Sequence, residues 1–202
     1  MYGDVMSSTQ DRLIETTREL LWERGYVGTS PKAILRRAGV GQGSMYHHFT
    51  GKGDLAQAAI RRTGEEMRAT VDRLLDAGGP AYERIAAYLL RERDVLRGCP
   101  VGRLTMDPDV LASEELRAPV DETIAHVKAR LAEVLQEGVH SGEFAAHLVP
   151  RDLAATIVAT VQGGYVLARA SGDTDAFDAG VRGLLALLAR APARTSPAPS
   201  TD

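Results

Sequence analysis

Apolar side chains recur every three or four residues along most of this chain, which is the spacing that one face of an α-helix requires. Runs rich in glycine and proline, including AGVG, TGKG and AGGP, interrupt the pattern. Alanine and leucine are abundant and strand-like runs are missing, so the sequence predicts an all-α fold. We expect helices over residues 9–24, 30–38, 42–49, 52–76, 81–97, 113–140, 150–170 and 174–190, with short helical turns from 98 to 112 and a kink or restart at Pro119.

The segment AGVGQGSMYHHF, residues 38–49, joins two of the predicted short helices. Over residues 30–49 a short helix, a turn that contains Gly39 and Gly41, and a second short helix follow one another, as in a helix-turn-helix motif. In this motif the second helix lies in the DNA major groove. An eight-residue helix is about 12 Å long and the groove is about 12 Å wide, so the predicted helix fits it.

The side chains of this second helix suit contact with DNA. Its polar members can donate and accept hydrogen bonds: Gln42, Ser44, Tyr46, His47 and His48. Met45 and Phe49 are four residues apart and can anchor its inner face. Gly43 leaves room for the backbone to approach the duplex, and Lys52, after the next break, can reach a phosphate.

Other interpretations of this helix are weaker. A solvated helix without a function also fits the spacing. Metal binding by His47 and His48 is disfavoured because adjacent helical residues diverge by about 100°, whereas a helical metal pair needs residues four apart. Catalysis by the pair is disfavoured because no nucleophile or carboxylate lies beside it.

The charge distribution supports a nucleic-acid partner only weakly. The whole chain of 202 residues has a formal net charge of −3. Residues 1–62 contain nine basic and six acidic side chains, a net charge of +3, which leaves −6 for the rest. A basic N-terminal third on an acidic body is a better indicator of DNA binding than the total.

Composition excludes several other classes. The single cysteine, Cys99, leaves neither an intrachain disulfide nor a thiolate zinc site, so we expect no metal and no cofactor. The first residues lack the pattern of a signal peptide, and no uncharged apolar run approaches the roughly 20 residues that span a bilayer. We therefore expect a cytoplasmic protein without a membrane partner.

Residues 10–55 resemble the DNA-binding domain of the tetracycline-repressor (TetR) family. The matching positions are Gly25–Tyr26, Thr29, Ile34, Ala38–Gly39–Val40, Gly43, Tyr46, His48–Phe49, Lys52 and Leu55. The resemblance implies a helix-turn-helix head of three helices on an all-helical regulatory body, assembled as a homodimer. The expected domains are residues 1–51, with 1–8 flexible, residues 52–190 for ligand binding and dimerisation, and a disordered tail at 191–202.

The resemblance also implies roles for individual residues. Gln42, Ser44 and His47 match base-facing positions, and Lys32 matches a position that reaches a base or a phosphate. Tyr46, His48 and Lys52 match phosphate contacts, and Thr29 and Ser30 match the start of the second helix, whose N–H groups approach the DNA backbone. Gly51 and Gly53 depart from the family, which commonly has Ser and Glu there, and we expect a weaker cap on the next helix, with Asp54 still favouring its first turn.

The body offers less specific signals. GCPVG at 98–102 and VQGGYVLARASGD at 161–173 resemble the branch of the lincomycin-resistance-type repressor. The last two predicted helices are expected to form a four-helix dimer interface through Ile157, Val161, Gly164, Leu167, Phe177, Val181, Leu184 and Leu188, although the same stripes could be monomer core. A chamber for a small, largely apolar effector is expected among the body helices, with Tyr88, Cys99, Met106, His126 and Gln162 as candidate lining residues, each of which could instead be structural.

The sequence therefore predicts a DNA-binding transcriptional regulator rather than an enzyme. We expect a homodimeric repressor that a small effector releases from a palindromic operator on double-stranded DNA. An activator or a ligand-independent DNA-binding protein is the alternative. An enzyme using Cys99 with His126 or His140, and a purely structural helical module, are more remote alternatives.

Overall fold

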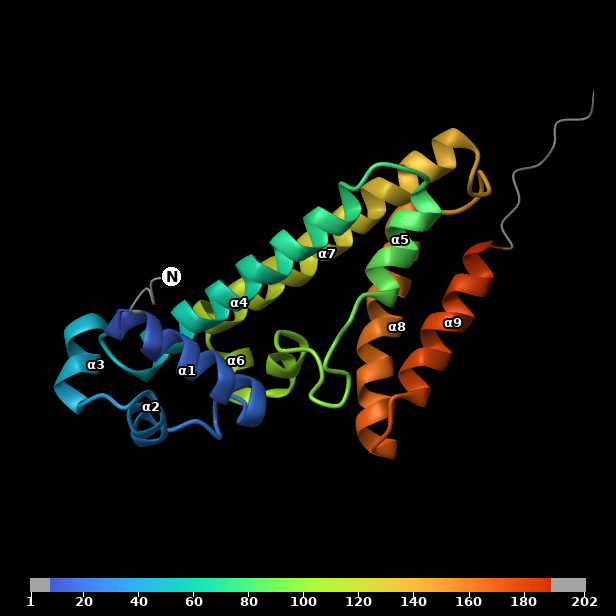
Figure 1. Cartoon of the computed structure of the whole chain (residues 1–202). Helices are drawn as coiled ribbons and strands as arrows, with labels where there is room; N and C mark the ends of the chain where they lie inside the picture. Colours follow the sequence, from blue (N-terminus) through green and yellow to red (C-terminus); the bar gives the residue numbers. More distant parts are fainter. Residues whose placement is uncertain (1–7, 190–202) are drawn as a thin grey trace, which may run out of the picture. The chain divides into compact units, whose positions relative to one another are not determined.

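A computed structural model describes residues 8–189 of this chain. The described residues contain helices and no strand, which confirms the predicted all-α fold (Figure 1). The elements are α1 (Thr9–Arg24), α2 (Pro31–Ala38), α3 (Gln42–His48), α4 (Lys52–Leu75), α5 (Ala81–Leu90), η1 (Gly102–Met106), α6 (Pro108–Ala112), α7 (Glu114–Ser141), α8 (Pro150–Ser171) and α9 (Asp175–Ala189). The flexible start expected at residues 1–8 lies outside the described residues except for Ser8, which caps α1, and the tail expected at 191–202 lies outside them entirely.

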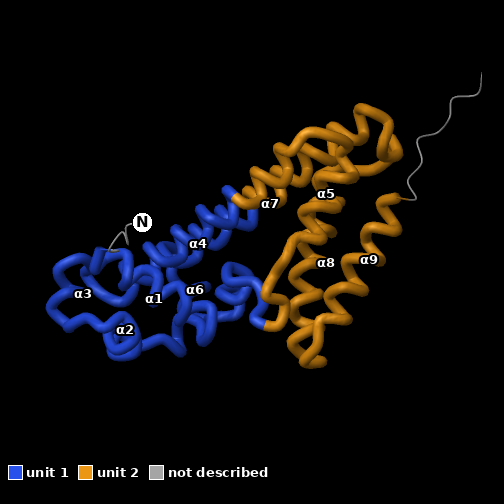
Figure 2. The backbone as a smooth tube through the Cα atoms, viewed as in Figure 1, with its two compact units in different colours: residues 1–69, 97–125 blue, residues 70–96, 126–202 orange. Residues whose placement is uncertain are grey.

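The helices pack into two units (Figure 2). The first consists of Met1–Ala69 with Arg97–Ala125, and the second consists of Thr70–Leu96 with His126–Asp202. Both α4 and α7 run from one unit into the other. The boundary expected at residue 51 therefore falls inside the first packing unit, and as a division between functional domains it stays a prediction.

Local signals place the helices of the first unit. Ser8 caps α1, because its hydroxyl oxygen accepts a hydrogen bond from the Asp11 amide at 3.0 Å. Ser30 caps α2 in the same way, and Pro31 occupies the first turn. Gly39, at a φ of 65°, ends α2 in the left-handed conformation that glycine adopts at little cost. The core between these helices contains fully buried side chains from each of them: Leu13, Leu20, Ile34, Met45 and Leu55.

Asp54 caps the start of α4, because the neighbouring Gly51 and Gly53 have no side chain that could do so. The Asp54 carboxylate in the first turn accepts a hydrogen bond from the Thr50 amide at 2.9 Å. This contact satisfies a backbone donor before the helix and places a negative charge near its positive end. The expectation that Asp54 favours the first turn is confirmed.

Pro119 lies inside a continuous α7, so the predicted restart does not occur, and the predicted kink stays a prediction. A proline removes the N–H that would bond to the carbonyl four residues earlier, here that of Glu115. The side-chain amide of Gln57 on α4 donates to this carbonyl at 2.9 Å. A donor from another helix thus replaces the missing backbone bond, and the helix continues.

In the second unit α5 ends at Leu90, seven residues before the predicted end. The Arg93 guanidinium donates hydrogen bonds to the carbonyls of Tyr88 and Leu89, at the end of the helix. These carbonyls have no partner within the helix once it stops, so Arg93 makes an early end favourable. At the other end, the Glu143 carboxylate accepts from the amides of Ala81 at 3.0 Å and Tyr82 at 3.1 Å.

The last two helices form an antiparallel pair (Figure 1). The rings of Tyr165 and Phe177 lie 5.0 Å apart between α8 and α9. Gly164 makes this approach possible, because a Cβ at this position would lie 2.8 Å from the Phe177 ring. By length and composition alone α8 could span a membrane, but one of its faces packs against α9, and core helices of soluble proteins pass the same test.

Candidate nucleic-acid interface

Helix α3 has one buried and one exposed face. Met45 is completely buried and Phe49, just after the helix, is 5% exposed, as expected for the inner anchors. The predicted DNA-contacting residues lie on the exposed side: Gln42, Gly43, Tyr46, His47 and His48 are exposed and Ser44 is half-buried. A Cβ at Gly43 would meet no atom within 4 Å, so open space surrounds the backbone there. This face is available to a large partner.

The N-terminal part of α2 is exposed as well. Ser30 and Lys32 are exposed, as the DNA-binding prediction requires. Thr29 differs, because it is 1% exposed and its hydroxyl donates to the Gly25 carbonyl at 2.7 Å. Its side chain therefore stabilises the α1–α2 turn and does not face a partner, so the expected surface role of this residue is restricted to its backbone.

Lys52 is held against an aromatic ring at the start of α4. Its ammonium nitrogen lies 3.8 Å from the centroid of the Tyr26 ring, a cation–π contact. Partial burial lowers the pKa of Lys52, and Asp109 and Asp107 oppose this shift. Burial likewise raises the pKa of the Tyr26 hydroxyl, and the same two aspartates add to that shift. Lys52, which is predicted to contact a phosphate, is therefore half-buried in the free protein.

Asp107 fixes the turn between α1 and α2, a role that the sequence did not reveal. One carboxylate oxygen accepts from the amides of Tyr26 at 2.7 Å and Val27 at 3.0 Å. The other oxygen accepts from the amide of Asp109 at 3.2 Å and lies 3.4 Å from that of Val110, which caps α6. The Asp-Pro pair before α6 is a cap signal, but it does not indicate which distant turn the carboxylate reaches.

Gly25 is required at this turn for two reasons. Its φ is 74°, in the left-handed region that disfavours residues with a side chain. A Cβ at this position would also lie 2.8 Å from a carboxylate oxygen of Asp107. The glycine thus lets the carboxylate approach the two amides that follow it.

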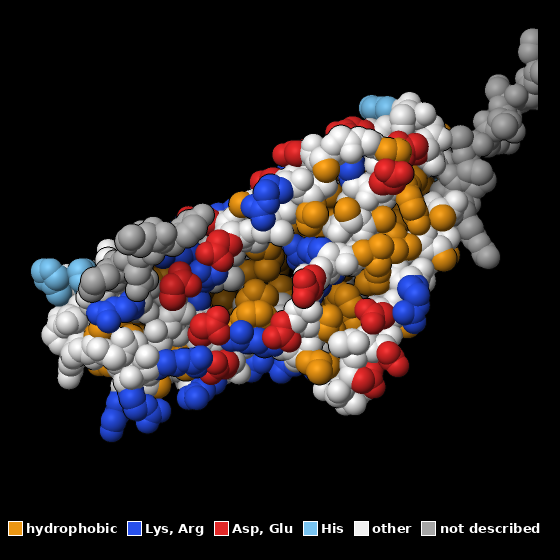
Figure 3. Space-filling model, in the orientation of Figure 1, with side chains coloured by type: hydrophobic (Ala, Val, Ile, Leu, Met, Phe, Trp, Pro, Cys, Tyr) orange, Lys and Arg blue, Asp and Glu red, His pale blue; other side chains and the backbone are white. Residues whose placement is uncertain are grey.

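Basic side chains gather over α2 in the space-filling view, and histidines mark the edge at α3 (Figure 3). Lys32 and Arg36 are exposed and make no ion pair with any residue from 8 to 189. Arg37 is instead paired with Glu23 at 2.7 Å. Arg36 is therefore a further candidate for a phosphate contact that the sequence analysis did not single out, and its signal was a basic residue within the first helix of the motif.

Nothing in the described part of the chain, residues 8–189, supports a metal centre, because no group of three or more His, Cys, Asp or Glu lies together there. Cys99 is 8% exposed, and its sulfur accepts a hydrogen bond from the Gly102 amide at 3.1 Å. His126 accepts or donates a hydrogen bond at 2.9 Å with Asp72. Both side chains thus have structural partners.

The predicted effector-lining residues are divided between the two units. Cys99 and Met106 belong to the first unit, and Met106 is 81% exposed. Tyr88, His126 and Gln162 belong to the second, where Tyr88 is buried and the other two are half-buried. The two cavities described below are lined by other residues, so the lining stays a prediction.

Most of the predicted dimer stripe is covered within a single chain. The residues that are buried in the second unit are Ile157, Val161, Gly164, Phe177, Val181, Leu184 and Leu188. Leu167 is 58% exposed, as are its neighbour Val166 at 62% and Leu187 at 71%. The 3.6-residue stripes thus fill the core of the unit, which is the alternative that the sequence left open, and a different apolar face is exposed.

Two family models cover the chain. "Bacterial regulatory proteins, tetR family" matches residues 13–59, which contain α2 and α3, and "Tetracyclin repressor-like, C-terminal domain" matches residues 79–184. This chain belongs to the TetR family. It is therefore a DNA-binding transcriptional regulator, as the sequence analysis predicted, and the assignment of α3 as its recognition helix stays a prediction.

Relatives of known name and structure agree with this TetR-family membership. The chain is 28% identical to the transcriptional repressor NemR of Escherichia coli over 137 residues, 64% of this chain and 68% of NemR. It is 27% identical to the regulator LmrA of Bacillus subtilis over 173 residues, 82% of this chain and 87% of LmrA. A crystal structure of a TetR regulator from Chloroflexus aurantiacus has a TM-score of 0.81 and 25% identity, covering 91% of this chain and 96% of that one. Because the relatives at 27–28% identity include NemR as well as LmrA, the narrower branch stays an interpretation.

Proposed function

We propose that this TetR-family regulator is a homodimeric repressor that binds a pseudo-palindromic operator on double-stranded DNA and is released by a small-molecule effector. The observation that carries the proposal is the two-faced recognition helix. Met45 and Phe49 anchor its inner face, and its exposed face presents only polar side chains and a glycine. The operator also places the protein in the cytoplasm, where the chromosome lies.

Base reading is assigned to exposed polar side chains of α3. Gln42 can form a paired donor–acceptor contact with adenine in the major groove. His47 lies five residues further on and is also exposed, so it is the second candidate for a contact with a base edge. Tyr46, His48 and Lys52 are assigned to phosphates, with Ser30 and Arg36 from α2, because these groups donate to phosphate oxygens without reading sequence.

The dimer is assigned to the exposed apolar face of the last two helices. On α8 this face includes Gly163, Val166 and Leu167, and on α9 it includes Gly183 and Leu187. Single exposed leucines are common, but three large apolar residues around open glycines favour close contact with a second copy. A two-fold pair of heads would contact half-sites separated by about 34–36 Å.

The first test is fluorescence anisotropy of the protein on the intergenic DNA beside its own gene, with a scrambled duplex of equal length as control. We expect at least a roughly 10³-fold preference for the specific site. His47→Ala should reduce the preference, and Lys52→Ala should weaken binding to both duplexes and reduce the salt slope by about one. His147→Ala and Lys128→Ala, exposed residues outside the motif, are the matched controls. Equal and weak binding of all variants to both duplexes contradicts the proposal.

The oligomeric state is tested by light scattering after gel filtration. Leu187→Glu introduces a charge on the exposed face of α9 and should shift a dimer toward the monomer. Leu111→Glu, at a leucine that is 50% exposed in the first unit, is the control and should stay dimeric. A Leu187→Glu protein that remains dimeric would exclude this face as the interface.

A further inference from the structure

The second unit contains a cavity of about 470 Å³ between the end of α5, the segment that follows it, and the first half of α9. This volume lies within the range of about 300–1,000 Å³ that is typical of small-molecule sites. Part of its lining is apolar, from Leu89, Val95, Phe177 and Val181. Three of these four side chains are buried, so they provide a fixed apolar wall.

Three guanidinium groups line the same cavity: Arg91 and Arg93 from the segment after α5 and Arg182 from α9. Two carboxylates, Glu92 and Asp178, also line it, so its formal charge is +1. Arg91 and Arg182 make no ion pair within residues 8–189. No carboxylate of the described residues therefore neutralises the charge of Arg91 or Arg182 by direct contact.

The cationic wall is held in place by the rest of the unit. The Arg93 guanidinium is bonded to the last carbonyls of α5 and lies 5.5 Å from the centroid of the Phe177 ring. The Arg91 guanidinium lies 5.1 Å from the centroid of the Tyr88 ring. The Nε atom of Arg91 is buried and has no hydrogen-bond acceptor among the described residues. A buried donor without an acceptor is costly, so the protein alone does not satisfy the hydrogen-bonding capacity of the Arg91 guanidinium.

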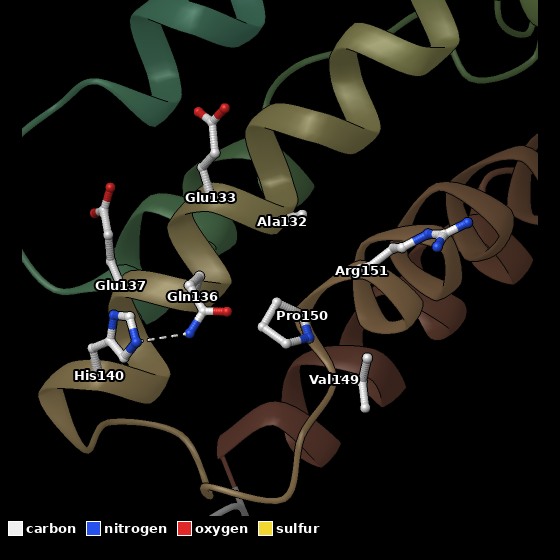
Figure 4. A pocket seen from close by; sticks show the side chains of 8 residues that line it. All are labelled: Ala132, Glu133, Gln136, Glu137, His140, Val149, Pro150 and Arg151. Carbon is white, nitrogen blue, oxygen red and sulfur yellow. Dashed lines mark hydrogen bonds between the residues drawn. The ribbon is translucent and has the colours of Figure 1, made fainter.

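A second cavity in the unit provides a contrast (Figure 4). It has a volume of about 560 Å³ and lies between α7 and the start of α8. Its charged lining residues are Glu133, Glu137 and Arg151, and its Gln136 and His140 side chains are bonded to each other at 3.1 Å. Glu133 is ion-paired with Arg130 and Glu137 with Arg84, so this lining offers one arginine without an ion pair among the described residues, Arg151, whereas the first cavity offers two.

We propose that the cavity at the end of α5 binds a small organic monoanion with a flat apolar body, such as an aromatic carboxylate or sulfonate. The anionic group would accept hydrogen bonds from Arg91 and Arg182, whose planar donors fit a carboxylate or sulfonate. The apolar body would lie against Leu89, Phe177 and Val181. The identification of this ligand with the effector rests on the function proposed above, whereas its binding does not.

The probe is 1-anilinonaphthalene-8-sulfonate, compared with N-phenyl-1-naphthylamine, which has the same aromatic body without the sulfonate. Fluorescence titrations of the full chain should show one site per chain and at least about tenfold tighter binding of the anionic probe. Arg91→Gln and Arg182→Gln should each weaken the anionic probe about tenfold and change the neutral probe less than twofold. Arg151→Gln, at the second cavity, is the control and should leave both affinities unchanged.

Two further variants keep the test valid if a glutamine substitution impairs folding. Arg91→Lys retains the charge without the planar donors and should give an intermediate loss. Val95→Glu, at a half-buried position of the lining, adds a negative charge and should weaken only the anionic probe. Circular dichroism verifies the fold of each variant. The proposal is overturned if both probes bind equally, or if every cavity variant binds the anionic probe like the wild type.

The same titration beside operator DNA separates the two proposals. If the anionic probe binds the cavity and weakens operator binding in wild type but not in Arg91→Gln, the cavity ligand acts as an effector. If the wild-type protein binds operator specifically while the probe fails to bind, the proposal of an anion site is wrong and the proposal of a repressor is retained. If the probe binds as predicted but no operator preference exists, the anion site stands and the proposed repressor is wrong.

Discussion

Replacement of Asp107 by alanine should destabilise the first unit. The carboxylate accepts from two amides of the α1–α2 turn and from the first turn of α6. Loss of a helix cap costs about 1 kcal/mol. Each hydrogen bond to a charged acceptor contributes about 1.5–3 kcal/mol, less where water can replace it, and the part-buried bond from Val27, a residue that is 57% exposed, is such a case. We expect a loss of about 2–4 kcal/mol in the free energy of unfolding.

Urea denaturation followed by circular dichroism measures this loss, with Asp109→Ala as the control. Asp109 is exposed two residues away, and we expect its substitution to cost less than about 0.5 kcal/mol. Asp107→Asn keeps one acceptor oxygen and should lie between the two. Operator affinity should fall as well, because the turn that Asp107 fixes leads directly into α2. Equal denaturation midpoints for Asp107→Ala and Asp109→Ala would refute the role of this carboxylate.

Three other substitutions test local features of the fold. Gly25→Ala should cost more than about 1 kcal/mol in urea denaturation, because it combines a φ of 74° with a Cβ 2.8 Å from the Asp107 carboxylate, and an unchanged midpoint would contradict this. Gly53→Ala should raise the melting temperature through a gain of about 0.5–1 kcal/mol, because its φ is not positive and the nearest atom to the new Cβ is 3.8 Å away; a lower melting temperature would count against the reasoning. Glu143→Gln should cost about 0.5–1 kcal/mol near pH 7. Burial opposes ionisation of Glu143, but the two amides that it caps lower its pKa overall. The contribution of Glu143 to the free energy of unfolding is therefore fully present above the unfolded pKa of about 4.3, and it disappears as the pH falls through the lower folded pKa. A difference between wild type and Glu143→Gln that is as large at pH 3 as at pH 7 would contradict this assignment.

Local sequence signals were sufficient to predict the short helices of the DNA-binding head. The cap at Ser30, the proline after it and the glycine breaks placed α2 and α3 within a residue of their observed ends. The burial of Met45 and the exposure of Tyr46 followed from helical spacing alone. These features depend on residues that are close in sequence, which is why periodicity and capping rules could predict them.

Features that depend on distant partners could not be predicted. Helix α5 ends early because Arg93 folds back on its carbonyls, and α7 continues through Pro119 because Gln57, 58 residues before Glu115, supplies a donor. Helical periodicity likewise identified the apolar stripes of α8 and α9 without showing what covers them. The structure places most of those residues in the core of the unit and leaves Leu167 exposed.

Lys52 allows a functional role to be separated from a structural one. A cation at the first turn of a helix opposes the helix dipole by about 0.3–1 kcal/mol, and the cation–π contact with Tyr26 contributes about 0.5–1 kcal/mol in return. Because these terms nearly cancel, Lys52→Ala should change the free energy of unfolding by less than about 0.5 kcal/mol. If Lys52 reaches a phosphate, the same substitution should weaken DNA binding and reduce its salt dependence, measured by anisotropy at several salt concentrations. A large loss of stability with unchanged DNA binding would instead make Lys52 a structural residue, and Arg36 would then be the stronger candidate for the phosphate contact.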